Sequence, residues 1–148
     1  MNVNTIEWNR IEIAPYGCAV HLPAGWETLP PVPSNGPEIL RATGGPGRQL
    51  IVFKMRTGSS STEQVASAVV EKLSSLGYED FATDQVRFAG QQGTRLEFVY
   101  RGGDRPDRRS REYFALRGPV AFCLGVGSYD WDTDEPVLDA IATRFELT

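Results

Sequence analysis

Three strand-like runs, TRLEFVYR (residues 94–101), REYFALRG (111–118) and PVAFCLGVGSYDW (119–131), follow one another along the chain. In the first run Leu96 and Phe98 share one face, which is typical of a strand with a buried side. In the third run large apolar residues at 120, 122, 124 and 126 alternate with the small residues Ala121, Cys123 and Gly125, so we expect close packing on both faces. Short turns or a polar hairpin tip join the runs, so we expect an antiparallel meander. A helix is predicted to close it, beginning near Thr133–Pro136, because proline is tolerated in the first helical turn.

The upstream half of the chain predicts more of the same sheet and one long helix. Val65, Val69 and Leu73 recur at helical spacing, so we expect their side chains to be buried against the sheet. Ser59–Thr62 offers capping residues at the start of this helix, and Gly77 suits its end. The other predicted elements are an edge strand over 6–13 and strands over 16–22, 38–42, 49–55 and 85–89. The fold class is therefore α+β, with a mainly antiparallel sheet of about six strands covered by two main helices.

Length and composition are those of one globular domain, residues 1–148, with 41% hydrophobic and 23% charged residues. A net charge of −4 argues against nucleic acid as a partner. No apolar run reaches the ~18–20 residues of a membrane helix, so we expect no membrane insertion. The first residues, MNVNTIEWNRIEIA, do not resemble a signal peptide. We therefore expect a cytoplasmic protein.

A proline-rich loop follows the turn at Leu22–Trp26. Residues 27–37 contain four prolines, which favour an extended loop because proline lacks a backbone donor and restricts φ. Loops of this length in compact domains are often functional.

The hairpin tip after residue 100 is a second candidate for function. Its arginines are Arg101, Arg105, Arg108, Arg109 and Arg111. On an acidic protein they predict a local positive surface that could hold a carboxylate-rich partner or a phosphate. The alternative is a solvated hairpin whose charges prevent edge-to-edge aggregation.

Aromatic residues offer a third candidate. Trp26 and Trp131 could edge a sheet face that binds a protein partner. The alternative for both is a place in the core or at its edge. We expect arginines to steer association and aromatic residues to supply affinity.

No residue pattern predicts catalysis, a metal or another cofactor. His21 is the only histidine and no nucleophile is paired with it in sequence. Cys18 and Cys123 lie in apolar strand contexts, which favours reduced, buried thiols over a disulfide or a reactive thiol. The acidic run from Asp130 to Glu135 lacks the glycine and distal glutamate of a calcium loop. We therefore expect no enzyme, no metal and no cofactor.

The order of elements resembles the PsbP/Mog-like α/β/α family, which includes bacterial DcrB-like domains. The matching features are LPAGW (22–26), a hairpin before one long helix, Arg111–Phe114 within a long hairpin, and a closing helix that ends in FEL (145–147). The resemblance covers residues 16–147. It implies a largely non-enzymatic, protein-binding domain. Among its members are cytoplasmic adaptor chaperones for type VI secretion effectors, typically homodimers that shield apolar helices of a client on a sheet face.

Three hypotheses follow from these observations. The first is a non-catalytic protein-binding adaptor or chaperone-like domain that forms a homodimer and takes part in secretion or assembly of its partner. The second is a small-molecule or anion-binding domain that uses the arginine-rich hairpin. The third, an enzyme built on His21, Cys18 or Cys123, has the least support. The client, the ligand, the oligomeric state and the pathway are not encoded in any motif of this sequence.

Overall fold

A computed structural model describes residues 3–32 and 36–148, so Pro33 of the predicted proline-rich loop and the first two residues lie outside the described chain. The helices are α1 (Thr62–Ser75) and α2 (Trp131–Thr143), with 3-10 turns η1 (Val3–Thr5) and η2 (Ala14–Tyr16). The strands are β1 (Trp8–Ile13), β2 (Cys18–Pro23), β3 (Glu27–Leu29), β4 (Glu38–Thr43), β5 (Gln49–Arg56), β6 (Glu79–Phe88), β7 (Gln91–Tyr100), β8 (Arg108–Arg117), β9 (Val120–Ser128) and β10 (Glu146–Leu147).

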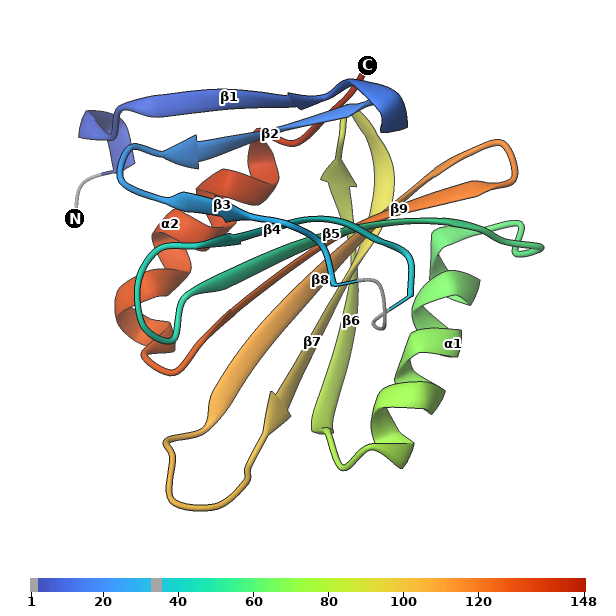
Figure 1. Ribbon diagram of the computed structural model, residues 1–148. Helices are drawn as coiled ribbons and strands as arrows, with labels where there is room; N and C mark the ends of the chain where they lie inside the picture. Colours follow the sequence, from blue (N-terminus) through green and yellow to red (C-terminus); the bar gives the residue numbers. More distant parts are fainter. Residues whose placement is uncertain (1–2, 33–35) are drawn as a thin grey trace.

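The strands form two sheets rather than one (Figure 1). The larger has seven strands in the order β3-β4-β5-β9-β8-β7-β6, and the smaller has the order β1-β2-β10. All paired neighbours run antiparallel. The α+β class and the antiparallel arrangement are confirmed. The main sheet has seven strands, close to the expected count of about six, because β3 adds an edge. Strands β1 and β2 form a separate small sheet with β10.

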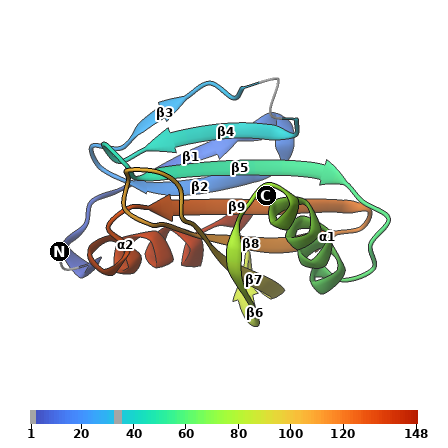
Figure 2. The same cartoon turned by 90° about the horizontal axis from the view of Figure 1, so that it is seen from below.

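The two faces of the large sheet carry separate cores, as the alternation in β9 predicts. Phe122 and Leu124 face the side covered by α2 and the small sheet. Ala121 and Cys123 face the opposite side, where they pack beneath α1. Figures 1 and 2 show the two helices on opposite sides of the strands.

Helix α1 begins as predicted, because the Ser61 hydroxyl accepts a hydrogen bond from the Gln64 backbone N–H at 3.2 Å. Val65 and Ala66 are buried against the sheet. Val69 and Leu73, which we expected to be buried, are only partly buried, although both pack against the same cluster. The reason is geometric: α1 contacts β6, β7 and β8, and its last turn lies beside the uncovered part of the sheet.

Helix α2 begins at Trp131, two residues before the predicted start, so Pro136 lies within the helix. After α2 the chain returns to the small sheet, where Glu146 pairs with Ala19 of β2. Phe145 stacks on Phe88 with ring centroids 5.1 Å apart. The C-terminal segment thus joins the small sheet to the large one.

The turn between β6 and β7 is tighter than the predicted turn at residues 90–93. Ala89 and Gly90 both have positive φ, +56° and +77°, and Phe88 pairs directly with Gln91. Two consecutive positive φ values match the right-handed twist of hairpin strands. Both strands are therefore longer than their apolar residues indicate, and most of β6 is an exposed, polar edge strand.

Candidate functional site: a groove beside helix α1

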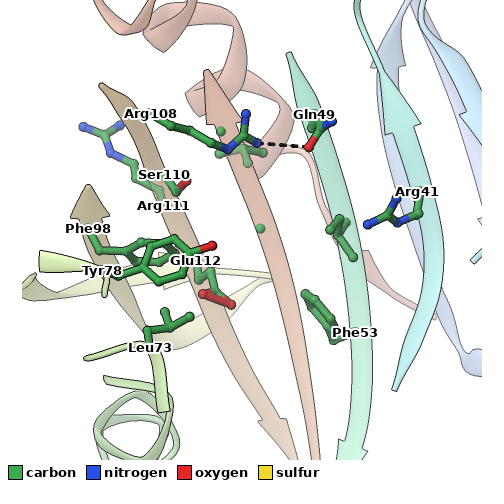
Figure 3. A pocket seen from close by; sticks show the side chains of 14 residues that line it. Arg41, Gln49, Phe53, Leu73, Tyr78, Phe98, Arg108, Ser110, Arg111 and Glu112 are labelled. Atoms are coloured by element: carbon green, nitrogen blue, oxygen red, sulfur yellow. Dashed lines mark hydrogen bonds between the residues drawn. The ribbon is translucent and has the colours of Figure 1, made fainter. Parts of the chain in front are cut away.

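A groove of about 340 Å³ opens on the α1 side of the large sheet, where the helix does not cover the strands. Its lining comes from β4, β5, β7, β8 and β9 and from the end of α1 (Figure 3). The volume falls in the range of about 300–1,000 Å³ that is usual for small-ligand pockets. Apolar walls face each other across it, with Phe53 on one side and Leu73, Tyr78 and Phe98 on the other.

Glycines of β9 form the floor of the groove. At Gly127 a Cβ would lie 2.6 Å from the Arg108 guanidinium and 2.9 Å from the Ser110 hydroxyl, so these two side chains would have to move. At Gly125 the nearest atoms would be at ordinary contact distances, 3.5 Å from the Glu112 side chain and 3.7 Å from the Ile51 carbonyl. Neither glycine contributes a side chain to the floor of the groove.

One carboxyl group, that of Glu112, lies in the lining of the groove (Figure 3). Its Oε1 accepts a hydrogen bond from the Cys123 thiol at 3.3 Å. Burial raises the pKa of Glu112, against smaller lowering effects from the Cys123 hydrogen bond and the charge of Lys72. The same burial and the nearby carboxyl raise the pKa of Cys123 well above its usual value.

The arginines around the groove already have partners. Arg108 donates to Gln49 Oε1 at 3.2 Å, and its guanidinium lies 5.3 Å from the Tyr129 ring centroid. Arg41 donates to Glu38 Oε1 at 2.6 Å. Neither forms an ion pair with Glu112 within the described residues.

An exposed aromatic surface continues from the groove past the end of α1. Tyr78 lies between Phe98 and Tyr100, with ring centroids 5.3 Å and 5.2 Å away. Tyr100 is 42% exposed and Leu76 is 59% exposed. Large apolar side chains exposed side by side are a feature of binding surfaces. We call the two rings Tyr78 and Tyr100, together with the adjoining Leu76, the aromatic rim of the groove.

The five predicted arginines do not form one free patch. Arg101 pairs with Glu79, Asp80 and Asp107. Arg111 pairs with Glu97 at 2.5 Å and Glu135 at 3.0 Å, and lies over the Trp131 ring.

The other three hairpin arginines form no ion pair with a carboxylate among the described residues, and of these Arg105 and Arg109 are exposed. Arg105 and Arg108 approach Tyr129. Arg109 is exposed, with no side-chain hydrogen bond or ion pair in the described part of the chain. Of the five hairpin arginines, Arg108 and Arg111 line the groove.

The two predicted tryptophans lie apart from the groove. Trp26 packs against the core cluster on the α2 side and covers Gly44, where a Cβ would meet its ring at 2.3 Å. Trp131 begins α2 on that same side. Both are partly buried at the core edge.

The remaining candidates for chemistry are separated in space. His21 contacts Glu146, which also accepts from Arg10 Nε at 3.0 Å, on the small sheet. Cys18 is buried, and burial raises its pKa to about 11. In residues 3–32 and 36–148 no group of three or more acidic, histidine or cysteine side chains is placed to hold a metal ion.

Asp134, from the acidic run, has a structural part instead. It accepts hydrogen bonds from Ser128 Oγ at 2.5 Å and from Arg48 Nε at 2.8 Å.

Neither described helix is long and apolar enough to cross a membrane.

Comparison with known proteins gives fold neighbours only at low identity. No protein-family model matches the sequence, and no curated protein sequence matches it. The solution structure of cyanobacterial PsbP from Synechocystis sp. PCC 6803 has a TM-score of 0.76 at 15% identity, covering 100% of this chain and 96% of that one. The Ran-binding protein Mog1p of Saccharomyces cerevisiae has a TM-score of 0.68 at 11% identity, covering 97% and 96%. The fold is PsbP/Mog-like.

A third neighbour with the PsbP/Mog-like fold is LpqN of Mycobacterium tuberculosis, a protein involved in cell envelope biogenesis. It has a TM-score of 0.63 at 14% identity and covers 98% of this chain and 92% of that one. The resemblance expected from the sequence is thus confirmed at the level of the fold. At these identities no residue role passes from one protein to another.

The groove and its rim are not predicted by the sequence analysis. One signal was present: Gly125 and Gly127 interrupt the apolar alternation of β9, and glycine inside a strand often marks a close approach of another group. The small face of this strand is closely packed at Ala121 and Cys123, beneath α1. At Gly125 it is not, because α1 leaves that position uncovered.

Glu112→Gln is expected to stabilise the protein at neutral and alkaline pH. Because the folded pKa is raised, protonation of Glu112 favours the folded state, and this stability is lost as pH rises through the folded pKa. Glutamine is never charged, so the variant should exceed the wild type above the folded pKa and match it below about pH 4. Urea unfolding across this pH range measures the difference. Glu71→Gln, on the exposed side of α1, is the control, and a less stable Glu112→Gln protein at about pH 8 would contradict the expectation.

Proposed function

We propose that this domain is a non-catalytic protein-binding module, an adaptor or chaperone-like domain whose partner docks on the groove and its aromatic rim. The observation that carries the proposal is the exposure of Leu76 and Tyr100 next to a sheet face that α1 leaves uncovered. Aromatic residues are enriched at protein interfaces and supply most of their affinity. The Ran-binding activity of Mog1p, which has the same fold, adds support by analogy.

A non-catalytic role is supported by the state of the candidate nucleophiles. Both thiols have raised pKa values, so they are protonated at neutral pH and weakly nucleophilic. His21 lies on the small sheet with Glu146, whereas Cys123 lies beneath α1. No base and nucleophile are therefore brought together from these three residues.

The finer expectations belong to the same proposal. They are a cytoplasmic location, a homodimer, a DcrB-like subfamily and a part in secretion. Arg105 and Arg109, the more accessible arginines of the hairpin, would steer a partner with acidic groups toward the domain. The alternative of an anion site on the hairpin has less support, since Arg101 and Arg111 are already paired with carboxylates.

The test is affinity purification of the tagged domain from its native cells with quantitative mass spectrometry. A Leu76→Asp/Tyr100→Asp double variant should recover the partner at least about ten-fold less than the wild type, because it places charge in the interface. Tyr16→Asp is the matched control: Tyr16 is 41% exposed, but it lies in η2, next to the small sheet. The proposal fails if no protein is enriched over a tag-only purification, or if the double variant and the control recover the same partners equally.

A further inference from the structure

We propose that the groove accepts an ammonium group on an apolar stem, with Glu112 as its counter-ion. The inference rests on the proposed function in one respect, since it takes a lysine side chain of the docked protein as the source of that group. It names the chemistry of the residue that the partner inserts beside the aromatic rim. Four features of the groove carry the argument.

The first feature is the incomplete hydrogen bonding of the Glu112 carboxyl. A carboxylate has two oxygens and about four acceptor positions. In the described chain the side-chain donor to it is the Cys123 thiol at 3.3 Å, and a thiol is a weak donor. No lysine or arginine forms an ion pair with Glu112 in residues 3–32 and 36–148. Glu112 is partly buried. A carboxylate that is partly withdrawn from water and lacks a strong partner costs free energy, and a cation entering the groove would offset that cost.

The second feature is the charge of the groups around Glu112. Cys123 faces it from β9, and Lys72 of α1 is near enough to lower its pKa by charge. Lys72 is exposed and forms no ion pair with the carboxyl. Of the arginines that line the groove, Arg108 bonds to Gln49 and Arg41 to Glu38, and Arg111 bonds to the carboxylates of Glu97 and Glu135.

The third feature is the lining on either side of the carboxyl. Figure 3 shows Glu112 between Tyr78 and Leu73 on one side and Phe53 on the other. Such walls suit the four methylene groups of a lysine, which pack along apolar surface while the charged end reaches a polar group. The Tyr78 and Phe53 rings can also attract a cation through their faces.

The fourth feature is size. The groove volume of about 340 Å³ is roughly eleven times the ~30 Å³ that one water molecule occupies in the liquid. A lysine side chain fills part of this space and leaves room for the residues beside it. Gly125 carries no side chain of its own, so the stem can approach the sheet there beside Glu112, whose Cγ lies 3.5 Å from where a Cβ would be.

The experiment uses purified, ¹⁵N-labelled full chain and Nα-acetyl-lysine-N-methylamide as the probe. Amide chemical shifts are followed in a pH series that rises from about pH 6, because the probe requires the ionised form of Glu112, whose pKa is raised. Norleucine and Nε-acetyl-lysine derivatives with the same blocked termini are the uncharged controls. We expect shifts at Gly125, Gly127 and Glu112 with the lysine probe. Binding of the uncharged controls should be at least about ten-fold weaker, as for loss of a charge-assisted hydrogen bond.

Two variants distinguish the effect of the Glu112 carboxylate on binding from the effect of the net charge of the protein. Glu112→Gln keeps the shape and an acceptor for the Cys123 thiol but removes the charge, and should weaken the lysine probe about ten-fold or more. Glu71→Gln removes a negative charge from the exposed side of α1 and should leave binding unchanged. Thermal unfolding of each variant confirms that it is folded.

Lowering the pH should weaken binding as Glu112 becomes protonated. The proposal is overturned if the lysine probe produces no shifts in the groove, if the norleucine derivative binds equally well, or if Glu112→Gln binds like the wild type. These outcomes are independent of whether a partner is captured from cells. Partner capture that depends on Leu76 and Tyr100, without lysine binding, would refute only the ammonium site. Lysine binding without a captured partner would refute only the protein-binding function.

Discussion

Phe114→Ala is expected to lower the free energy of unfolding by about 3–5 kcal/mol, which is the usual cost of truncating a fully buried phenylalanine. Phe114 lies on β8 and is completely buried in the cluster beneath α1, together with Val65 and Leu96. The loss combines the transfer free energy of the ring with the cavity that remains. Domains of this kind are stable by only about 5–15 kcal/mol, so the loss removes a large share of the total.

Urea unfolding followed by circular dichroism measures this effect, and Tyr100→Ala is the matched aromatic control. Tyr100 is 42% exposed at the aromatic rim, so its truncation should cost less than about 1–2 kcal/mol. A Phe114→Ala protein no less stable than Tyr100→Ala would show that α1 does not pack on this part of β8. The helix position, and with it the groove, would then be wrong.

Gly93→Ala is expected to destabilise the protein by about 1–3 kcal/mol or more, although it adds a single methyl group. A Cβ at Gly93 would lie 2.5 Å from the Phe114 backbone carbonyl oxygen and 3.2 Å from Phe88 Cβ. A backbone oxygen cannot move aside as the end of a long side chain can. The β7–β8 ladder would have to shift, and its hydrogen bonds would lengthen.

Gly125→Ala is the control for this prediction, because it adds the same methyl group to a neighbouring part of the sheet. Its new Cβ would be 3.5 Å from Glu112 Cγ and 3.7 Å from the Ile51 carbonyl, which are ordinary contacts. We expect its free energy of unfolding to stay within about 0.5–1 kcal/mol of the wild type. Equal losses for the two alanine variants would contradict the close approach at Gly93. Thermal and urea unfolding of both proteins give the comparison.

Much of the local structure could be predicted from the sequence because its signals lie within a few residues of one another. The spacing of Val65, Val69 and Leu73 identifies α1, and Ser61 caps it as expected. The alternation in β9 correctly assigns Phe122 and Leu124 to one core and Ala121 and Cys123 to the other. The predicted strand boundaries are less accurate where polar residues continue a strand. Strand β6 begins before the predicted residue 85, because an exposed edge strand has few apolar residues to mark it in the sequence.

The candidate site depended on information that no local pattern contains. Arginines at the hairpin predicted a positive surface, but the charge that remains free is set by carboxylates elsewhere in the chain, such as Glu79 and Glu135. For Trp26 and Trp131 the sequence leaves a binding face and the core edge open as alternatives, and the structure puts both residues at the core edge on the α2 side.

The sequence by itself therefore determined the elements, their order and the two faces of the main strands, because hydrophobic periodicity is a property of neighbouring residues. Only the tertiary structure decided how far α1 covers the sheet, and so left Gly125 and Glu112 open to a groove. It also decided that the last residues join β2, through pairs such as Glu146 with Ala19. These outcomes depend on contacts between residues far apart in the chain, whose geometry is set by packing of the whole domain.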